Sequence, residues 1–143
     1  KPEVGDQNAH QVTLEQFFAQ AQVVSLHTPL TPETEFMINA EFIEKFAHNI
    51  YLINTARGRS VVTQDLVAAL ERGKVLGAGL DVLEYEHSSF EKLHTQELPE
   101  ALKVLLSLDN VILSPHIAGW THQSKEKLAQ VIVAKIQNHF PIK

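Results

Sequence analysis

The chain has 143 residues, of which 44% are hydrophobic and 20% charged, values ordinary for a soluble globular protein with a buried core. Its formal net charge is −5 and it has no block of basic residues, which argues against a dominant nucleic-acid surface. The absence of cysteine excludes disulfides and thiol catalysis, and no apolar run approaches the ~20 residues that span a membrane.

The first part of the chain predicts a short helix, a strand and a second helix, in that order. Thr13 and Gln16 fit a capping box at the start of the first helix. The apolar strand over residues 23–27 runs into a stretch with two prolines, which prevent it from continuing. Asn39 is suited to cap the second helix, whose predicted buried residues are Phe42, Ile43 and Phe46.

Three further strands are predicted over residues 50–54, 76–82 and 111–114. Strands that alternate with helices imply βαβ units. We therefore expect an α/β fold of Rossmann-like type, with a parallel sheet and flanking helices.

The helices between and after these strands carry recognisable end signals. Thr63 is expected to cap the first of them and Gly73 to end it. Pro99 begins a shorter helix, and Thr121 caps a long amphipathic one. The predicted apolar side of this last helix consists of Leu128, Val131, Ile132 and Ile136.

Three polar residues follow three successive strands. Arg57, Glu86 and His116 are 29 and 30 residues apart, close to the ~30 residues of one strand–helix unit. They are therefore expected to gather along the edge of the sheet where open α/β folds bind ligands. A guanidinium fork, a carboxylate and an imidazole together suit acid–base chemistry on a small acid.

Each of these residues also has a structural interpretation when taken alone. Arg57 fits a solvated loop, His116 a hydrogen-bonded structural histidine, and Glu86 a solvated acidic loop. Asp81, near the end of the third strand, could cap a turn. Trp120, after the histidine loop, could help to shape the pocket or could pack in the core. The joint placement at strand ends favours the functional interpretation.

Four motifs occur in order along residues ~12 to ~138: SLHTPLT (25–31), INTARG (53–58), GAGLDV (77–82) and SPHIAG (114–119). With these motifs the chain resembles the D-isomer-specific 2-hydroxyacid dehydrogenases, a family that includes phosphoglycerate dehydrogenases and glyoxylate/hydroxypyruvate reductases. The resemblance implies an NAD-dependent oxidoreductase that interconverts a D-2-hydroxy acid and a 2-oxo acid. NADP is not excluded.

The resemblance also implies roles for the catalytic residues. Arg57 would bind the substrate carboxylate and polarise the 2-oxo group, and His116 would be the general acid–base. Glu86 would hydrogen-bond His116 and favour its protonated form. The nicotinamide would carry the hydride.

Cofactor contacts follow from the same resemblance. Asp81 matches the carboxylate that holds the nicotinamide amide. The other implied cofactor-binding residues are Thr28, Thr55, Ala56, Arg57, His116 and Gly119.

The Gly-x-Gly-x-x-Gly turn that cradles the cofactor pyrophosphate is not in the sequence. We therefore expect residues 1–143 to be the C-terminal portion of a dinucleotide-binding domain whose first βαβ unit is missing, with the substrate domain absent. In the strand order 3-2-1-4-5-6, strand 23–27 would be strand 3, separated from strand 50–54 by a gap. It would then be displaced, paired across chains, or paired again with 50–54. The isolated chain is expected to be inactive.

Two departures and several alternatives accompany the resemblance. His87 stands where the family has proline, and the stretch from His87 to Leu108 is longer than usual. Glu86 argues against formate dehydrogenases, which have glutamine there. The alternative function is a non-catalytic, dinucleotide-sensing binding module of corepressor type, and a histidine metal site ranks low because no HExxH motif occurs. A cytoplasmic homodimer with no nucleic-acid or membrane partner is expected.

Overall fold

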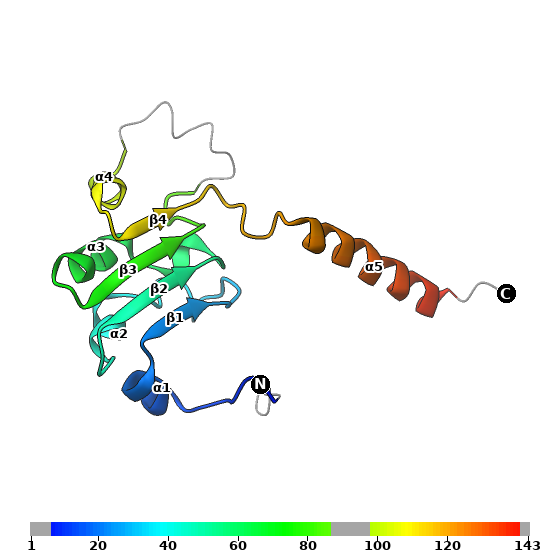
Figure 1. The fold of residues 1–143 in the computed structure, drawn as a ribbon, viewed down its shortest axis with the longest axis horizontal. Helices are drawn as coiled ribbons and strands as arrows, with labels where there is room; N and C mark the ends of the chain where they lie inside the picture. The colour runs from blue at the N-terminus through cyan, green and yellow to red at the C-terminus, as the bar shows by residue number, and fades with distance from the viewer. Residues whose placement is uncertain (1–6, 87–97, 141–143) are drawn as a thin grey trace.

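The computed structural model describes residues 7–86 and 98–140. The elements follow one another in an alternating α/β pattern (Figure 1). They are α1 (Leu14–Gln20), β1 (Val23–Leu26), α2 (Ala40–Glu44), β2 (Ile50–Asn54), the 3-10 turn η1 (Gly58–Ser60), α3 (Thr63–Glu71), β3 (Val75–Leu80), α4 (Glu100–Ser107), β4 (Val111–Leu113) and α5 (His122–His139).

The four strands form one parallel sheet in the order β1-β2-β3-β4. The expected α/β fold with a parallel sheet is therefore confirmed. The last residues of the strands are in register, because Leu26 pairs with Asn54, Asn54 with Leu80, and Leu80 with Leu113. The loops that leave the carboxyl ends of the strands consequently start at one level along the same edge.

The predicted gap beside the first strand is wrong. β1 pairs with β2 along its whole length, from Val23 opposite Tyr51 to Leu26 opposite Asn54. Of the three expected arrangements, direct pairing with residues 50–54 is the one found. β1 is therefore not strand 3 of a 3-2-1-4-5-6 sheet, because in that order two other strands separate strand 3 from strand 4.

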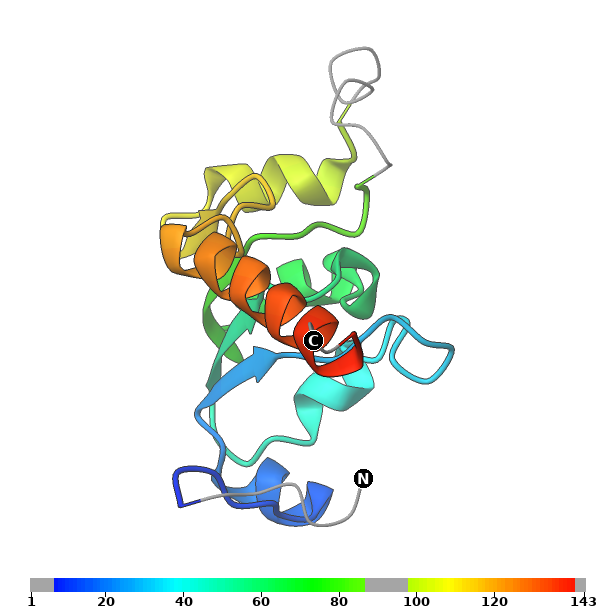
Figure 2. The ribbon, with the colours of Figure 1, turned by 90° about the vertical axis from the view of Figure 1, so that its right-hand side faces the viewer.

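Helices α2 and α3 cover one face of the sheet (Figure 2). Side chains alternate along β2, so Ile50 and Leu52 are buried while Tyr51 and Ile53 are exposed. Buried residues of α2 and α3, among them Ile43 and Leu66, belong to the same hydrophobic core as the buried strand residues. This burial holds the strand ends in place and so supports the loops that follow them.

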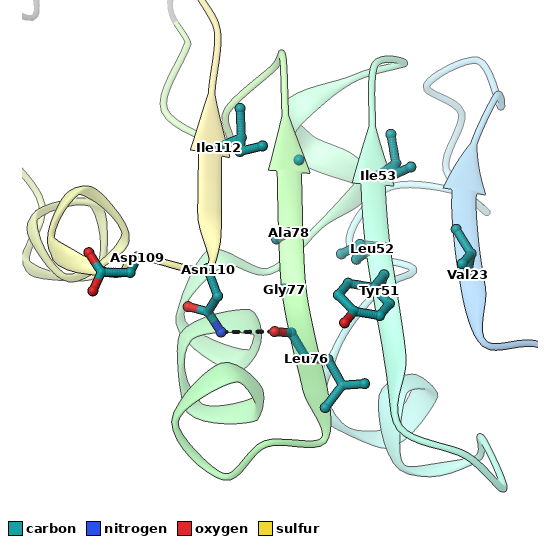
Figure 3. Close-up of a pocket in the computed structure, with 11 residues that line it drawn as sticks. Val23, Tyr51, Leu52, Ile53, Leu76, Gly77, Ala78, Asp109, Asn110 and Ile112 are labelled. Carbon is teal, nitrogen blue, oxygen red and sulfur yellow. Dashed lines mark hydrogen bonds between the residues drawn. The ribbon is translucent and has the colours of Figure 1, made fainter.

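The opposite face of the sheet has no helix over it among the described residues (Figure 3). It presents a shallow, mostly apolar hollow of about 670 Å³. Its large apolar side chains are Val23, Tyr51, Ile53, Leu76 and Ile112. The hollow lies over the middle of the sheet rather than at the carboxyl ends of the strands.

Helix α5 extends away from the sheet and buries none of its residues (Figure 1). Its predicted cap is confirmed, because the Thr121 hydroxyl accepts a hydrogen bond from the Ser124 amide. The predicted apolar side is present but exposed. No helix among the described residues combines the length and apolar character needed to cross a membrane.

Most predicted helix ends are confirmed, with one correction. Thr13 and Gln16 form the capping box, Asn39 caps α2, and Gly73 follows α3 with a φ of 71°. Thr63, however, is the first residue of α3 and not its cap. The Thr63 amide instead donates to Glu84 Oε2 at 2.7 Å, so the cap comes from a residue 21 positions further along the chain.

Candidate active site

The candidate site is built from the loops that follow β2, β3 and β4. Arg57 follows β2, Glu86 follows β3, and His116 follows β4. Because the strand ends are in register, these loops emerge side by side from the carboxyl edge of the sheet. This is the edge where open α/β sheets bind ligands.

Glu86 and His116 are in direct contact. Oε2 of Glu86 lies 3.1 Å from Nδ1 of His116. The other carboxylate oxygen of Glu86 accepts a hydrogen bond from the Leu83 amide at 2.8 Å. The Glu86 side chain is 17% exposed and that of His116 is 49% exposed. The carboxylate is therefore anchored at both oxygens, while Nε2 of the imidazole has no partner among the described residues.

Arg57 sits in a turn that is shaped by Asn54. The Asn54 side chain is fully buried, donates to the Arg57 carbonyl at 2.9 Å and accepts from the Ala56 amide at 3.1 Å. The guanidinium of Arg57 is exposed, and its Nη1 donates to the Ala56 carbonyl at 2.6 Å. Within the described chain it makes no hydrogen bond or ion pair with Glu86 or His116, so direct contacts join only two of the three predicted catalytic residues.

Gly58 brings the Arg57 loop against the loop that leads to Glu86. A β-carbon at position 58 would overlap the backbone carbonyl of Leu83. Because the overlapping atoms belong to the backbone of Leu83, no side chain could rotate to relieve the overlap. The absence of a side chain at Gly58 therefore sets the spacing between the loops of Arg57 and Glu86.

Asp81 lies at the end of β3 and is only 3% exposed. Its Oδ1 accepts hydrogen bonds from the Ser114 hydroxyl at 2.5 Å and from the Ile117 amide at 2.9 Å, and its Oδ2 accepts from the Ala118 amide at 2.9 Å. Burial alone raises the pKa of a carboxyl group. In Asp81 these hydrogen bonds and the nearby His116 imidazole outweigh burial and lower the pKa below its ordinary value.

His116 has a left-handed backbone, with a φ of 56°. A non-glycine residue in this conformation loses about 1–2 kcal/mol relative to its preferred regions. The His116 amide donates to the Asp81 carbonyl at 2.9 Å and to the Ser114 carbonyl at 3.0 Å. The amide of this strained residue is thus hydrogen-bonded both to Ser114 in its own loop and to Asp81 at the end of β3.

The remaining predicted cofactor residues lie at or near the same edge. Thr28 follows β1, and its buried hydroxyl has no hydrogen-bond partner in the described chain. Thr55 and Gly119 are exposed, and Ala56 is half-buried. A buried acceptor at Asp81, an unpartnered hydroxyl at Thr28 and a small side chain at Ala56 fit a flat ligand that carries an amide.

Two other predictions concern neighbouring residues. Trp120 is 76% exposed, so of its two interpretations packing in the core does not hold in the described chain, and a role in shaping the pocket stays a prediction. His87 lies outside the described residues. Within residues 7–86 and 98–140, no group of three histidine or acidic side chains is placed to hold a metal ion.

Three residues of the site were not singled out from the sequence: Asn54, Glu84 and Ser114. Each lies within or beside one of the four motifs, no more than two positions from a residue that was assigned a role. A polar residue at the last position of an apolar strand, as at Asn54, was an available signal. Nothing local indicates that Glu84 caps α3, because its partner is distant in sequence.

The sequence and the fold of the chain are similar to those of known proteins. Residues 1–118 match the family described as "D-isomer specific 2-hydroxyacid dehydrogenase, NAD binding domain". The chain is 38% identical over 123 residues to D-lactate dehydrogenase of Lactiplantibacillus plantarum, covering 83% of this chain and 36% of that protein.

Two solved structures are also similar. D-2-hydroxyisocaproate dehydrogenase superposes with a TM-score of 0.79 at 32% identity, covering 92% of this chain and 41% of that one. D-lactate dehydrogenase from Aquifex aeolicus, complexed with NAD and lactic acid, gives a TM-score of 0.70 at 38% identity, covering 89% and 40%. The chain therefore spans about 40% of the length of these relatives.

Proposed function

Because the chain belongs to the D-isomer specific 2-hydroxyacid dehydrogenase family, we propose that it supplies the acid–base residues of an NAD-dependent oxidoreductase. The reaction interconverts a D-2-hydroxy acid and a 2-oxo acid. The hydrogen-bonded pair of Glu86 and His116 at the carboxyl edge of the sheet carries this proposal. Such a pair suits proton transfer to or from a substrate oxygen.

In this mechanism Nε2 of His116 gives a proton to the oxygen of the 2-oxo group during reduction and takes it back during oxidation. Glu86 holds the ring through Nδ1, so that Nε2 is directed away from the carboxylate. Arg57, whose guanidinium is exposed and outside any ion pair of the described chain, binds the substrate carboxylate with its planar fork of donors. NAD, when bound, carries the hydride.

The expected cofactor, NAD, is confirmed at the level of the family, whose matched domain is the NAD-binding one. In our proposal the chain forms the nicotinamide end of that site and is the C-terminal portion of the dinucleotide-binding domain. Asp81 offers a hydrogen-bond acceptor and Thr28 a hydroxyl to the nicotinamide. The other residues that line this end of the site are Thr55, Ala56 and Gly119. Oδ2 of Asp81 has one acceptor position left after its bond to Ala118.

A chimera tests the proposal. Residues 1–143 would replace the matching segment of the L. plantarum D-lactate dehydrogenase, and NADH oxidation would be followed with pyruvate, glyoxylate and hydroxypyruvate. We expect turnover of at least one acid, and a loss of about 10²–10⁴-fold in kcat for His116→Asn. His122→Asn, an exposed histidine at the start of α5, is the matched control. A chimera that binds NADH but reduces none of these acids, or a fully active His116→Asn chimera, would refute the proposal.

We also propose that the protein is a cytoplasmic homodimer. The apolar side chains that stand exposed together on this face of the sheet, among them Tyr51, Leu76 and Ile112, support an association with another surface. Light scattering on the purified chain measures its mass directly. A strictly monomeric chain at all concentrations would argue against dimerisation through its own surfaces.

A further inference from the structure

The residues around His116 form a pattern of backbone donors that converge on one carboxylate. The amides of Ile117 and Ala118 both point to the side chain of Asp81, at 2.9 Å each. The His116 amide points to the backbone carbonyl of the same residue, also at 2.9 Å. Three successive amides of the His116 loop therefore each donate a hydrogen bond to Asp81.

This convergence depends on the left-handed backbone of His116. Successive amides point outward in different directions along an extended chain, whereas a left-handed residue next to right-handed ones turns them into a concave, anion-binding nest. A φ of 56° is uncommon for a residue other than glycine and carries a free-energy cost that other contacts can offset. The compensating group is the buried carboxylate that fills the nest.

Ser114 completes the arrangement from the other side of His116. Its hydroxyl donates to Oδ1 of Asp81 at 2.5 Å, and its carbonyl accepts from the His116 amide at 3.0 Å. The backbone is thus tied to Asp81 both before and after the histidine. Oδ1 accepts two of these bonds and Oδ2 one, so most acceptor positions of the carboxylate are used by the chain itself.

We propose that Asp81, with Ser114, is a positioning residue that holds His116 in its left-handed conformation and thereby keeps the imidazole against Glu86. This role is distinct from any contact of Asp81 with the nicotinamide. Its consequence for catalysis rests on the proposed function, whereas the geometry itself does not. A ring released from this backbone would lose its 3.1 Å contact with Glu86.

Three substitutions separate this role from a general contribution to folding. Asp81→Asn keeps the shape but puts an amide donor where an acceptor is needed for Ile117 or Ala118. Ser114→Ala removes one donor and leaves the carboxylate, and Ser114→Thr keeps the hydroxyl. Asp109→Asn is the matched control, because Asp109 is an exposed residue just before β4.

The measurement is NMR of the full 143-residue chain. Two signals together form the His116 signature, which reports the contact of the imidazole with Glu86. One is a nuclear Overhauser contact between the His116 ring proton next to Nδ1 and the Glu86 side chain. The other is a set of ring-nitrogen chemical shifts that place the proton on Nδ1. We expect Asp81→Asn to abolish both. Ser114→Ala should raise the ratio of molecules without the His116–Glu86 contact to molecules with it by up to about tenfold. This factor corresponds to the loss of one hydrogen bond to an ion. Ser114→Thr and Asp109→Asn should leave both unchanged.

An unchanged His116 signature in a folded Asp81→Asn chain would overturn the proposal. If Asp81→Asn does not fold, the comparison of Ser114→Ala with Ser114→Thr tests the proposal. A weaker His116 signature in Ser114→Ala than in Ser114→Thr supports the positioning role of Asp81 and Ser114, and equal signatures overturn it. None of these readouts requires turnover, so a failure of the proposed enzymatic function would leave the result interpretable.

Discussion

Glu84 Oε2 accepts a hydrogen bond from the backbone amide of Thr63 at 2.7 Å, and so caps a helix that begins 21 residues earlier. The loop between β3 and Glu86 is thereby attached to the start of α3. Burial and the Glu84 charge together raise the pKa of Tyr85, so its hydroxyl stays protonated at neutral pH.

Removal of this cap should destabilise the chain. We expect Glu84→Ala to lower the free energy of unfolding by about 1 kcal/mol, because α3 loses the only side chain bonded to its first amide. Urea denaturation followed by circular dichroism measures the change. Glu126→Ala, on the exposed surface of α5, is the control and should be neutral. Equal effects of the two substitutions would show that the Thr63 contact does not matter.

Gly58 should tolerate no side chain. Gly58→Ala places a methyl group on the carbonyl of Leu83 and should lower the free energy of unfolding by about 1–3 kcal/mol. Gly79→Ala is the control, because a β-carbon at Gly79, in β3, would meet nothing within 4 Å. The same denaturation assay compares them. A Gly58→Ala chain as stable as Gly79→Ala would mean that the two loops are not packed as described.

The charge of Asp81 should make stability depend on pH in the acid range. Its pKa is lowered in the folded chain relative to the ordinary 3.8 of the unfolded one, so folding is favoured by the ionised form. The stabilisation is fully present above the unfolded value and is lost as pH falls through the lower folded pKa. Wild type should therefore be more stable than Asp81→Asn at pH 6, and this advantage should shrink below pH 3.8. A difference between the two chains that is the same at every pH would contradict this.

The isolated chain should not oxidise NADH with a 2-oxo acid. Its sequence contains no Gly-x-Gly-x-x-Gly turn, so nothing of that kind is available to bind the cofactor pyrophosphate. The assay is the decrease of NADH absorbance with pyruvate or hydroxypyruvate at high protein concentration. Turnover by the isolated chain that is lost in His116→Asn would contradict this prediction, because catalysis would then need no cofactor-binding residues beyond those of this chain.

Local sequence patterns predicted the elements well. Short apolar runs bounded by turn residues located the four described strands to within two residues, and the caps at Thr13, Asn39 and Thr121 were predicted from residue type. The placement of Arg57, Glu86 and His116 after successive strands followed from the repeat of the βα unit. These features depend on interactions between residues close in sequence.

Several features that depend on distant residues were not singled out from the sequence. The pairing of β1 with β2 was only one of three arrangements left open, because an assumed strand order put a gap between them. The cap of Thr63 comes from Glu84, and the left-handed backbone of His116 depends on Asp81, 35 residues earlier. The Arg57 guanidinium donates to the carbonyl of the preceding residue, Ala56. The spacing of residues along the sequence could not indicate this orientation.

The most direct test of the central claim is a crystal structure of the chimera with NADH and oxamate, a 2-oxo acid analogue. We predict that the Arg57 guanidinium binds the oxamate carboxylate and that Nε2 of His116 lies about 3 Å from its carbonyl oxygen, with Glu86 still on Nδ1. Oxamate bound without contact to either Arg57 or His116, next to an ordered nicotinamide, would contradict the account.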